Sequence, residues 1–122
     1  MKTAALTLTI FLLALAIITA NALYIEKTVG HFIDNIEKLE PLEHGQRFSK
    51  LQTLETQWNK EKNIIQISVC HTKIDTVSDL LASLIVYEEY GNRQEYQKTA
   101  KLLCNAFEEL RLLEELSITN IF

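Results

Sequence analysis

The sequence predicts an all-α protein: an N-terminal transmembrane helix followed by an antiparallel helical hairpin or three-helix bundle with long helices. The chain opens with an uncharged apolar segment, Thr3 to Ile25. Only three glycines and one proline occur in 122 residues, so few turns interrupt the chain. Beyond the opening segment, apolar residues recur at spacings of three and four, the period of an amphipathic helix.

The opening segment, Thr3 to Ile25, is long enough to cross a bilayer. As a helix it measures about 34 Å, against a hydrocarbon core of about 30 Å. We therefore expect residues 1–25 to form a transmembrane anchor and residues 26–122 to form one helical domain. Because Lys2 and the N-terminal amine lie on the short side, we expect that end in the cytoplasm and the C-terminal domain outside the cell membrane.

An alternative reading of the same segment is a cleaved signal peptide. Ala20-Asn21-Ala22 has the small-x-small form of a signal-peptidase site, and cleavage after Ala22 would release a secreted protein. Apolar residues resume directly afterwards and continue a helical pattern, which favours a retained anchor. A lipoprotein anchor is not expected, since no cysteine lies in or just after the segment.

The first helix is predicted to continue beyond the membrane. An apolar stripe follows one face at spacings of four and three: Ile25, Val29, Phe32, Ile36 and Leu39. Pro41 disfavours helical geometry at Glu40, and Gly45 permits a turn. The stripe is expected to pack on the domain's own bundle or against a partner helix.

The middle of the chain, from Gln46 to Tyr90, contains neither glycine nor proline. One stripe consists of Phe48, Leu51, Leu54 and Trp58, and a second of Ile64, Ile67, Cys70, Ile74, Val77, Leu81 and Leu84. The two stripes do not share a register, so we expect a bend or short break somewhere in 59–75.

The next turn is predicted at Gly91-Asn92. Asn92 and Glu95 have the spacing of a capping box, in which each side chain bonds the other residue's backbone N–H. The last helix carries the stripe Tyr96, Ala100, Leu103, Phe107, Leu110 and Leu113. We expect it to end near Leu116. The triplets Gly45-Gln46-Arg47 and Gly91-Asn92-Arg93 each open a helix, which suggests either a duplicated hairpin or coincidence.

Charge and motif content argue against several function classes. Beyond the apolar segment, 11 basic and 16 acidic residues give a net charge of −5, without the basic stripe that nucleic acid requires. No phosphate-binding glycine loop or nucleophile elbow occurs. The adjacent pairs Glu88-Glu89, Glu108-Glu109 and Glu114-Glu115 are predicted to be solvated helix faces. We expect no enzyme and no cofactor.

Four residues are candidates for chemistry. Cys70 and Cys104 face an oxidising compartment in this topology, but a helical hairpin separates them along its axis, so two small core residues are favoured over a disulfide. His71 and Asp75 share a helix face and are candidate metal ligands. Two ligands are too few for a closed site, and a local hydrogen bond is the simpler expectation.

Three apolar residues are candidates for contact with a partner: Trp58, Phe32 and Ile36. Tryptophan is common at the centre of protein interfaces. The ordinary expectation for Trp58 is packing within the bundle.

The chain resembles a family of small, single-span bacterial proteins named domain of unknown function 4363. The resemblance rests on the N-terminal span, Trp58, the His71-x-x-Ile74-Asp75 cluster, the leucine-rich helix that follows, and the closing Asn120-Ile121-Phe122. The chain departs from the family's pattern at Gln46-Arg47-Phe48, where an acidic residue and tryptophan are usual, and at Thr72-Lys73, where an acidic residue follows the histidine. The family has no established activity, so the resemblance implies location and fold only.

The sequence therefore favours an uncharacterised membrane-anchored helical protein that serves as an interaction or structural module of the cell envelope. Its expected partners are the lipid bilayer, through Thr3 to Ile25, and another protein, with a homo-oligomer left open and no nucleic acid. The alternative is a sensor or carrier of a small ligand, since helix bundles hold ligands between facing helices and would signal through a partner.

Overall fold

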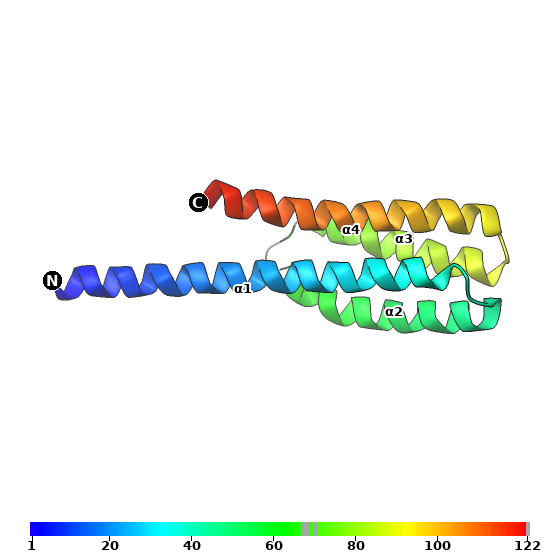
Figure 1. Ribbon diagram of the computed structural model, residues 1–122, viewed down its shortest axis with the longest axis horizontal. Helices are drawn as coiled ribbons and strands as arrows, with labels where there is room; N and C mark the ends of the chain where they lie inside the picture. The colour runs from blue at the N-terminus through cyan, green and yellow to red at the C-terminus, as the bar shows by residue number, and fades with distance from the viewer. Residues whose placement is uncertain (67–68, 70, 122) are drawn as a thin grey trace.

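In the part of the chain that the structure describes, four long helices run alternately up and down (Figure 1). They are α1 (Lys2–Leu39), α2 (His44–Ile65), α3 (His71–Glu89) and α4 (Arg93–Ile121). The structure is a computed structural model and describes residues 1–66, 69 and 71–121, with the side-chain surroundings described as far as Leu112.

Each helix packs on the next in sequence, and α4 returns to pack on α1, which closes the bundle. Only the second half of α1 belongs to this bundle, whereas its first half projects alone beyond the other helices (Figure 1). The turns that join α1 to α2 and α3 to α4 lie together at the end far from the N-terminus, which we call the distal end. The opposite end of the bundle, beside the projecting half of α1, is the proximal end.

An aromatic cluster forms the centre of the core. The rings of Phe32 and Phe107 stack with centroids 5.4 Å apart, and Trp58 meets both rings edge-on at 5.7 and 5.4 Å. Such edge-to-face and offset pairs add about 0.5–1.5 kcal/mol each beyond the burial of area. The indole N–H donates to Ser78 Oγ at 2.9 Å, so α1, α2, α3 and α4 all meet at this point.

The predicted all-α class and the long helices are confirmed, and the bundle has four helices because α1 itself supplies one of them. The stripe of α1 is buried in the domain's own core: Ile25, Val29, Phe32, Ile36 and Leu39. The helix ends at Leu39, just before Pro41, and it passes residue 25 without a break. The stripe is therefore not exposed to a partner helix.

The break expected within 59–75 lies between Ile65 and His71. In the second stripe, Ile64 is a wrong assignment: it is exposed, and its neighbour Ile65 is buried instead. Ile74, Val77, Leu81 and Leu84 are buried as predicted, whereas Ile67 and Cys70 lie outside the described residues.

Two charged residues occupy core positions that the apolar pattern did not predict. Arg47, rather than Phe48, is the buried residue one helical turn before Leu51. Glu88, expected on a solvated face, is only 3% exposed, while Glu89 is exposed. Both can be buried because the charge of Arg47 and the charge of Glu88 neutralise each other, as described below.

The turn at Gly91 is confirmed, with a φ of 69° that favours glycine. Only half of the capping box forms: Asn92 Oδ1 accepts from the Glu95 backbone N–H at 3.3 Å, whereas the Glu95 carboxylate lies 3.7 Å from Lys98. The predicted end near Leu116 is wrong, because α4 continues to Ile121. Neither glycine nor proline follows Leu116, and ordinary polar residues cost a helix less than about 0.7 kcal/mol each.

Candidate functional site

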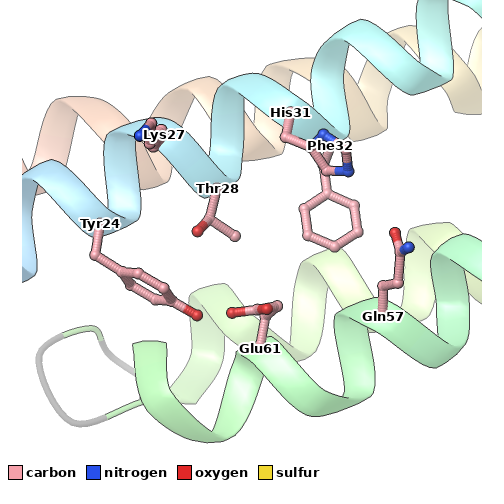
Figure 2. Close-up of a pocket in the computed structure, with 7 residues that line it drawn as sticks. All are labelled: Tyr24, Lys27, Thr28, His31, Phe32, Gln57 and Glu61. Carbon is pink, nitrogen blue, oxygen red and sulfur yellow. The ribbon is translucent and has the colours of Figure 1, made fainter.

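A polar groove opens between α1 and α2 at the proximal end of the bundle (Figure 2). It has a volume of about 490 Å³ and is lined by Tyr24, Lys27, Thr28, His31, Phe32, Gln57 and Glu61. The α1 residues follow at threes and fours, which places them on one side of the helix. This side lies beside the buried stripe, so the groove adjoins the core.

Tyr24, Thr28 and Glu61 point toward one another across the groove (Figure 2). Among the described residues, Glu61 Oε2 has no hydrogen-bond partner although this oxygen is buried. A buried acceptor without a donor costs about 1–3 kcal/mol. The groove therefore holds an acceptor that lacks a donor, next to an aromatic face and two hydroxyl groups.

At the distal edge of the groove, beside His31, the polar groups have hydrogen-bond partners. Asn35 donates to the backbone carbonyl of His31 at 2.7 Å, and its amide nitrogen lies 3.3 Å from ring nitrogens of the same histidine. A smaller hollow of about 220 Å³ shares His31 and Gln57 with the groove and extends it toward the distal end. The hollowed surface between α1 and α2 therefore extends beyond the groove alone.

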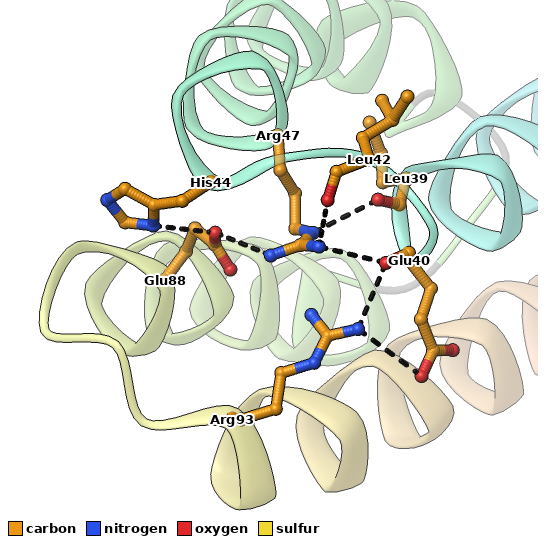
Figure 3. A network of polar contacts seen from close by, with 7 residues as sticks. All are labelled: Leu39, Glu40, Leu42, His44, Arg47, Glu88 and Arg93. Atoms are coloured by element: carbon orange, nitrogen blue, oxygen red, sulfur yellow. Dashed lines mark hydrogen bonds and ion pairs between the residues drawn. The ribbon is translucent and has the colours of Figure 1, made fainter.

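The distal end carries a second polar cluster, the arginine network (Figure 3), formed by Glu40, His44, Arg47, Glu88 and Arg93. Arg47 donates from Nη1 to Glu88 Oε1 at 2.8 Å. His44 Nδ1 lies 2.9 Å from the same oxygen. The ion pair is almost wholly buried, with side-chain exposures of 10% for Arg47 and 4% for Glu88.

Arg47 also satisfies the carbonyl groups at the end of α1. Its Nε donates to the Leu39 carbonyl at 3.0 Å, and its Nη2 donates to the carbonyls of Glu40 (2.9 Å) and Leu42. The last carbonyls of a helix have no partner within the helix. Arg47 therefore caps α1 and fastens the first turn to α3 in one step.

The two Gly-x-Arg triplets meet at this end. Arg93 Nη2 donates to the Glu40 carbonyl at 3.0 Å, the same oxygen that Arg47 contacts. Both guanidinium groups lie over the Tyr96 ring, 5.5 and 5.4 Å from its centroid. Burial raises the pKa of Tyr96 to about 12, although the nearby Arg47 charge acts in the opposite direction.

Comparison with known families identifies the family of the chain. The model of the family described as Domain of unknown function (DUF4363) matches residues 19–121. The chain belongs to this family. No curated protein and no solved structure matches it. The DUF4363 match includes the whole bundle, and with it both the groove and the arginine network.

The interaction candidates of this DUF4363 chain lie inside the bundle. Trp58, Phe32 and Ile36 are each at most 3% exposed, and the first two belong to the aromatic cluster. Only Phe32 reaches the groove, where it forms part of the lining. None of the three is available to a partner on the outer surface.

His71 and Asp75 are both exposed on α3. Among the side chains that the structure describes, in residues 1–66, 69 and 71–112, no group of three His, Cys, Asp or Glu is close enough to hold a metal ion. Of the cysteines, Cys70 lies outside the described residues and Cys104 is a half-buried free thiol. Burial, with added repulsion from Glu37 and Glu108, raises the pKa of Cys104 to about 11.

The sequence did not single out the groove or the arginine network. A signal for the network was present, since Arg47 and Glu88 stand at core positions: Arg47 is four residues before Leu51, and Glu88 is four residues after Leu84. For the groove, Tyr24 and Thr28 lie four apart on α1, as Gln57 and Glu61 do on α2. Nothing in the sequence showed that these two pairs face each other.

Proposed function

We propose that the protein is a single-pass, membrane-anchored helical module of the cell envelope that acts at the membrane surface through the groove between α1 and α2. The observation that carries the proposal is the uncovered first half of α1. Its most apolar 18-residue window has a mean hydropathy of 2.3, and none of it is buried by the rest of the chain. The large apolar side chains there are 56–68% exposed: Leu6, Leu8, Ile10, Phe11, Leu12, Leu13 and Ile17.

Water is an unfavourable surrounding for such a segment. Burying a leucine, isoleucine or phenylalanine side chain is worth about 1.5–3 kcal/mol, so these partly exposed side chains together represent of the order of 10 kcal/mol. A bilayer supplies that burial without any protein partner. The same length and composition also suit a signal peptide, so retention of the segment has to be tested directly.

The continuity of α1 supports retention. The first buried residues, Ala22 and Ile25, follow the exposed segment within the same helix. Cleavage after Ala22 would remove Ala22 itself, the first buried residue of α1, and would leave Ile25 in the first turn of the shortened helix. We infer that anchor and bundle form one structural unit, with the N-terminus in the cytoplasm and the bundle outside.

The test is the mass and location of the protein in cells. We expect it to stay with the membrane after an alkaline wash and to have the full-length mass. A soluble product that lacks the first 22 residues contradicts the proposal and supports the secreted alternative.

Orientation is tested by labelling a single thiol from outside intact cells. Cys104 is a poor target because it is half-buried and its pKa is raised, so Gln52→Cys on the exposed face of α2 is preferable, with both native cysteines changed to serine. Labelling by an impermeant maleimide supports an external bundle. Labelling only after lysis contradicts it.

A protein partner, or a second copy of the chain, remains part of the proposal. With the α1 stripe buried, such a partner is expected to use exposed apolar residues of α3, α4 and the turn between them, namely Val86, Leu102 and Tyr90. Capture of the tagged protein from mild detergent tests this, and a strictly monomeric protein without a stoichiometric partner contradicts it. The described cavities are surface grooves between helices, so they offer no support for a ligand buried within the core.

A further inference from the structure

The groove between α1 and α2 has the chemistry of a binding site for an ammonium group. The buried Glu61 oxygen is an acceptor without a donor among the described residues. The hydroxyl groups of Tyr24 and Thr28 point into the same space, and the Tyr24 ring supplies a π face (Figure 2). The carboxylate and hydroxyl oxygens favour a cation that carries N–H donors, and the aromatic face attracts a cation of either kind.

A positive charge stands at the edge of the same groove. Lys27 is exposed and is one of the lining residues, one position before Thr28 on α1. The groove therefore presents a negative group within and a positive group at its rim. A ligand that carries an ammonium and a phosphate close together matches this arrangement of charges.

The height of the groove points to the membrane surface. Tyr24 lies at the end of the apolar segment. His31, which lines the other end of the groove on α1, is about 10 Å further along the helix axis. The polar head groups of a bilayer occupy a layer about 5–8 Å thick on each side of the hydrocarbon core. An anchored chain thus holds the groove at the level of the head groups.

We propose that this groove binds phosphoethanolamine, with its primary ammonium on Glu61 and its phosphate near Lys27. The ligand comes from the head group of an aminophospholipid or from a soluble phosphoethanolamine compound. The lipid source rests on the proposed function, since it requires the anchor, whereas the soluble source does not.

The unpartnered oxygen decides between ammonium groups. A primary ammonium carries three N–H donors and satisfies Glu61, whereas the quaternary ammonium of choline carries none. The groove therefore discriminates ethanolamine from choline by a charge-assisted hydrogen bond, which corresponds to a preference of about tenfold or more. A phosphoglycerol head group, which lacks an ammonium, is expected to bind more weakly still.

The experiment measures lipid retention by native mass spectrometry, with the full-length protein in detergent and equal amounts of phosphatidylethanolamine, phosphatidylcholine and phosphatidylglycerol. We expect about tenfold greater retention of phosphatidylethanolamine. Glu61→Gln is expected to abolish the preference, while Glu55→Gln, which makes the same charge change elsewhere on α2, is expected to preserve it. Equal retention of the lipids by the wild type overturns the lipid source, and an unchanged preference in Glu61→Gln overturns the assignment of the site to Glu61.

Titration with soluble phosphoethanolamine separates the two sources. Saturable binding that Glu61→Gln removes supports the site with a soluble ligand, and retention of the lipid alone supports the head-group source. No binding in either measurement overturns the site. Circular dichroism checks the fold of each variant. If Glu61→Gln loses helix, Tyr24→Phe is measured in its place, and we expect it to weaken the preference for phosphatidylethanolamine. An unchanged lipid preference in Tyr24→Phe contradicts the role of the Tyr24 hydroxyl.

The outcome also distinguishes this site from the anchor. Cleavage after Ala22 would remove the apolar segment but leave every lining residue in place, from Tyr24 to Glu61. A soluble cleaved protein that still binds phosphoethanolamine therefore contradicts the proposed function and supports the site. A membrane-retained protein that shows no preference for phosphatidylethanolamine supports the proposed function and contradicts the site.

Discussion

The two ends of the bundle use charged side chains in opposite ways. At the distal end, Glu88 is buried beneath Arg47 and His44, and all three guanidinium nitrogens of Arg47 have acceptors. At the proximal end, Glu61 lies in an open groove with one buried oxygen unpartnered among the described residues. A carboxylate whose donors belong to the chain stabilises the fold, whereas one that lacks a donor is suited to an external ligand.

The largest effect is expected from Arg47→Met. This change leaves Glu88 buried without its cation and the end of α1 without its cap, so the free energy of unfolding should fall by about 3–5 kcal/mol. Thermal unfolding of the full chain in detergent, followed by circular dichroism, measures the loss. Arg93→Met is the matched control, because its ion pair with Glu40 and its hydrogen bond to the Glu40 carbonyl are exposed, so its loss should be only about 1–2 kcal/mol. Equal losses in both variants would show that burial of the distal ion pair has no importance.

A double variant sharpens the same test. Replacing both partners, as Arg47→Met with Glu88→Leu, removes the buried charge altogether and should recover a large part of the loss. A double variant as unstable as Arg47→Met alone would assign the loss to the α1 cap rather than to the ion pair.

The next effect concerns pH at the distal end. The pKa of Tyr96 is about 12 in the folded protein and about 10 in an unfolded chain. Because the folded pKa is raised, its stabilising contribution is complete below pH 10 and is lost as the pH rises through 12. The loss amounts to roughly 3 kcal/mol.

Tyr96→Phe isolates this contribution. The variant should show a shallower decline in stability between pH 10 and 12 than the wild type, while Cys104 titrates in both proteins. Denaturation midpoints at several pH values measure the difference. Parallel declines would mean that the Tyr96 hydroxyl ionises as readily in the folded state as in the unfolded one.

A smaller effect of opposite sign is expected at the proximal end. Glu61→Leu removes an acceptor that lacks a donor, so the ligand-free protein should gain about 1 kcal/mol in stability. Glu88→Leu should instead lose stability, because it leaves Arg47 unpaired. Denaturation of both variants beside Glu55→Leu provides the comparison. A loss of stability in Glu61→Leu would contradict the unsatisfied state of that oxygen.

The smallest expected effect is at the cap of α4. Asn92→Ala removes one exposed hydrogen bond to the Glu95 backbone N–H and should cost about 0.5 kcal/mol. Asn92→Ser, which retains a capping oxygen, should cost less. If the alanine variant matches the loss in Arg47→Met, the distal end depends on its second turn as much as on its first.

The helices and most of the core could be predicted from the sequence because the relevant signals are local. Pro41 ends α1 and Gly91 marks the last turn, while spacings of three and four identified the buried stripe of α1 and that of α3 from Ile74 onward. Such signals involve residues within one or two helical turns of each other.

Neither the groove nor the arginine network could be predicted, because both depend on residues that are distant in the sequence. A charged residue at a core position looks like a surface residue until its partner is known, and Arg47 and Glu88 are 41 positions apart. The groove depends on the pairing of Tyr24 with Glu61 across two helices, which no spacing within one helix reveals. The end of α4 was missed because weak helix formers are tolerated when no glycine or proline follows.

The unbroken course of α1 makes an anchored chain behave as a lever. From Ile25 to Leu39 the helix rises about 20 Å, so if Ile25 lies at the hydrocarbon boundary, as the proposed anchor requires, the paired turns stand about that far above it. Single-span helices lean by about 20° on average, and such a lean displaces the turns sideways by about 7 Å. In the proposed membrane-anchored form, the lean of α1 would therefore set where the distal end of the bundle lies relative to the bilayer.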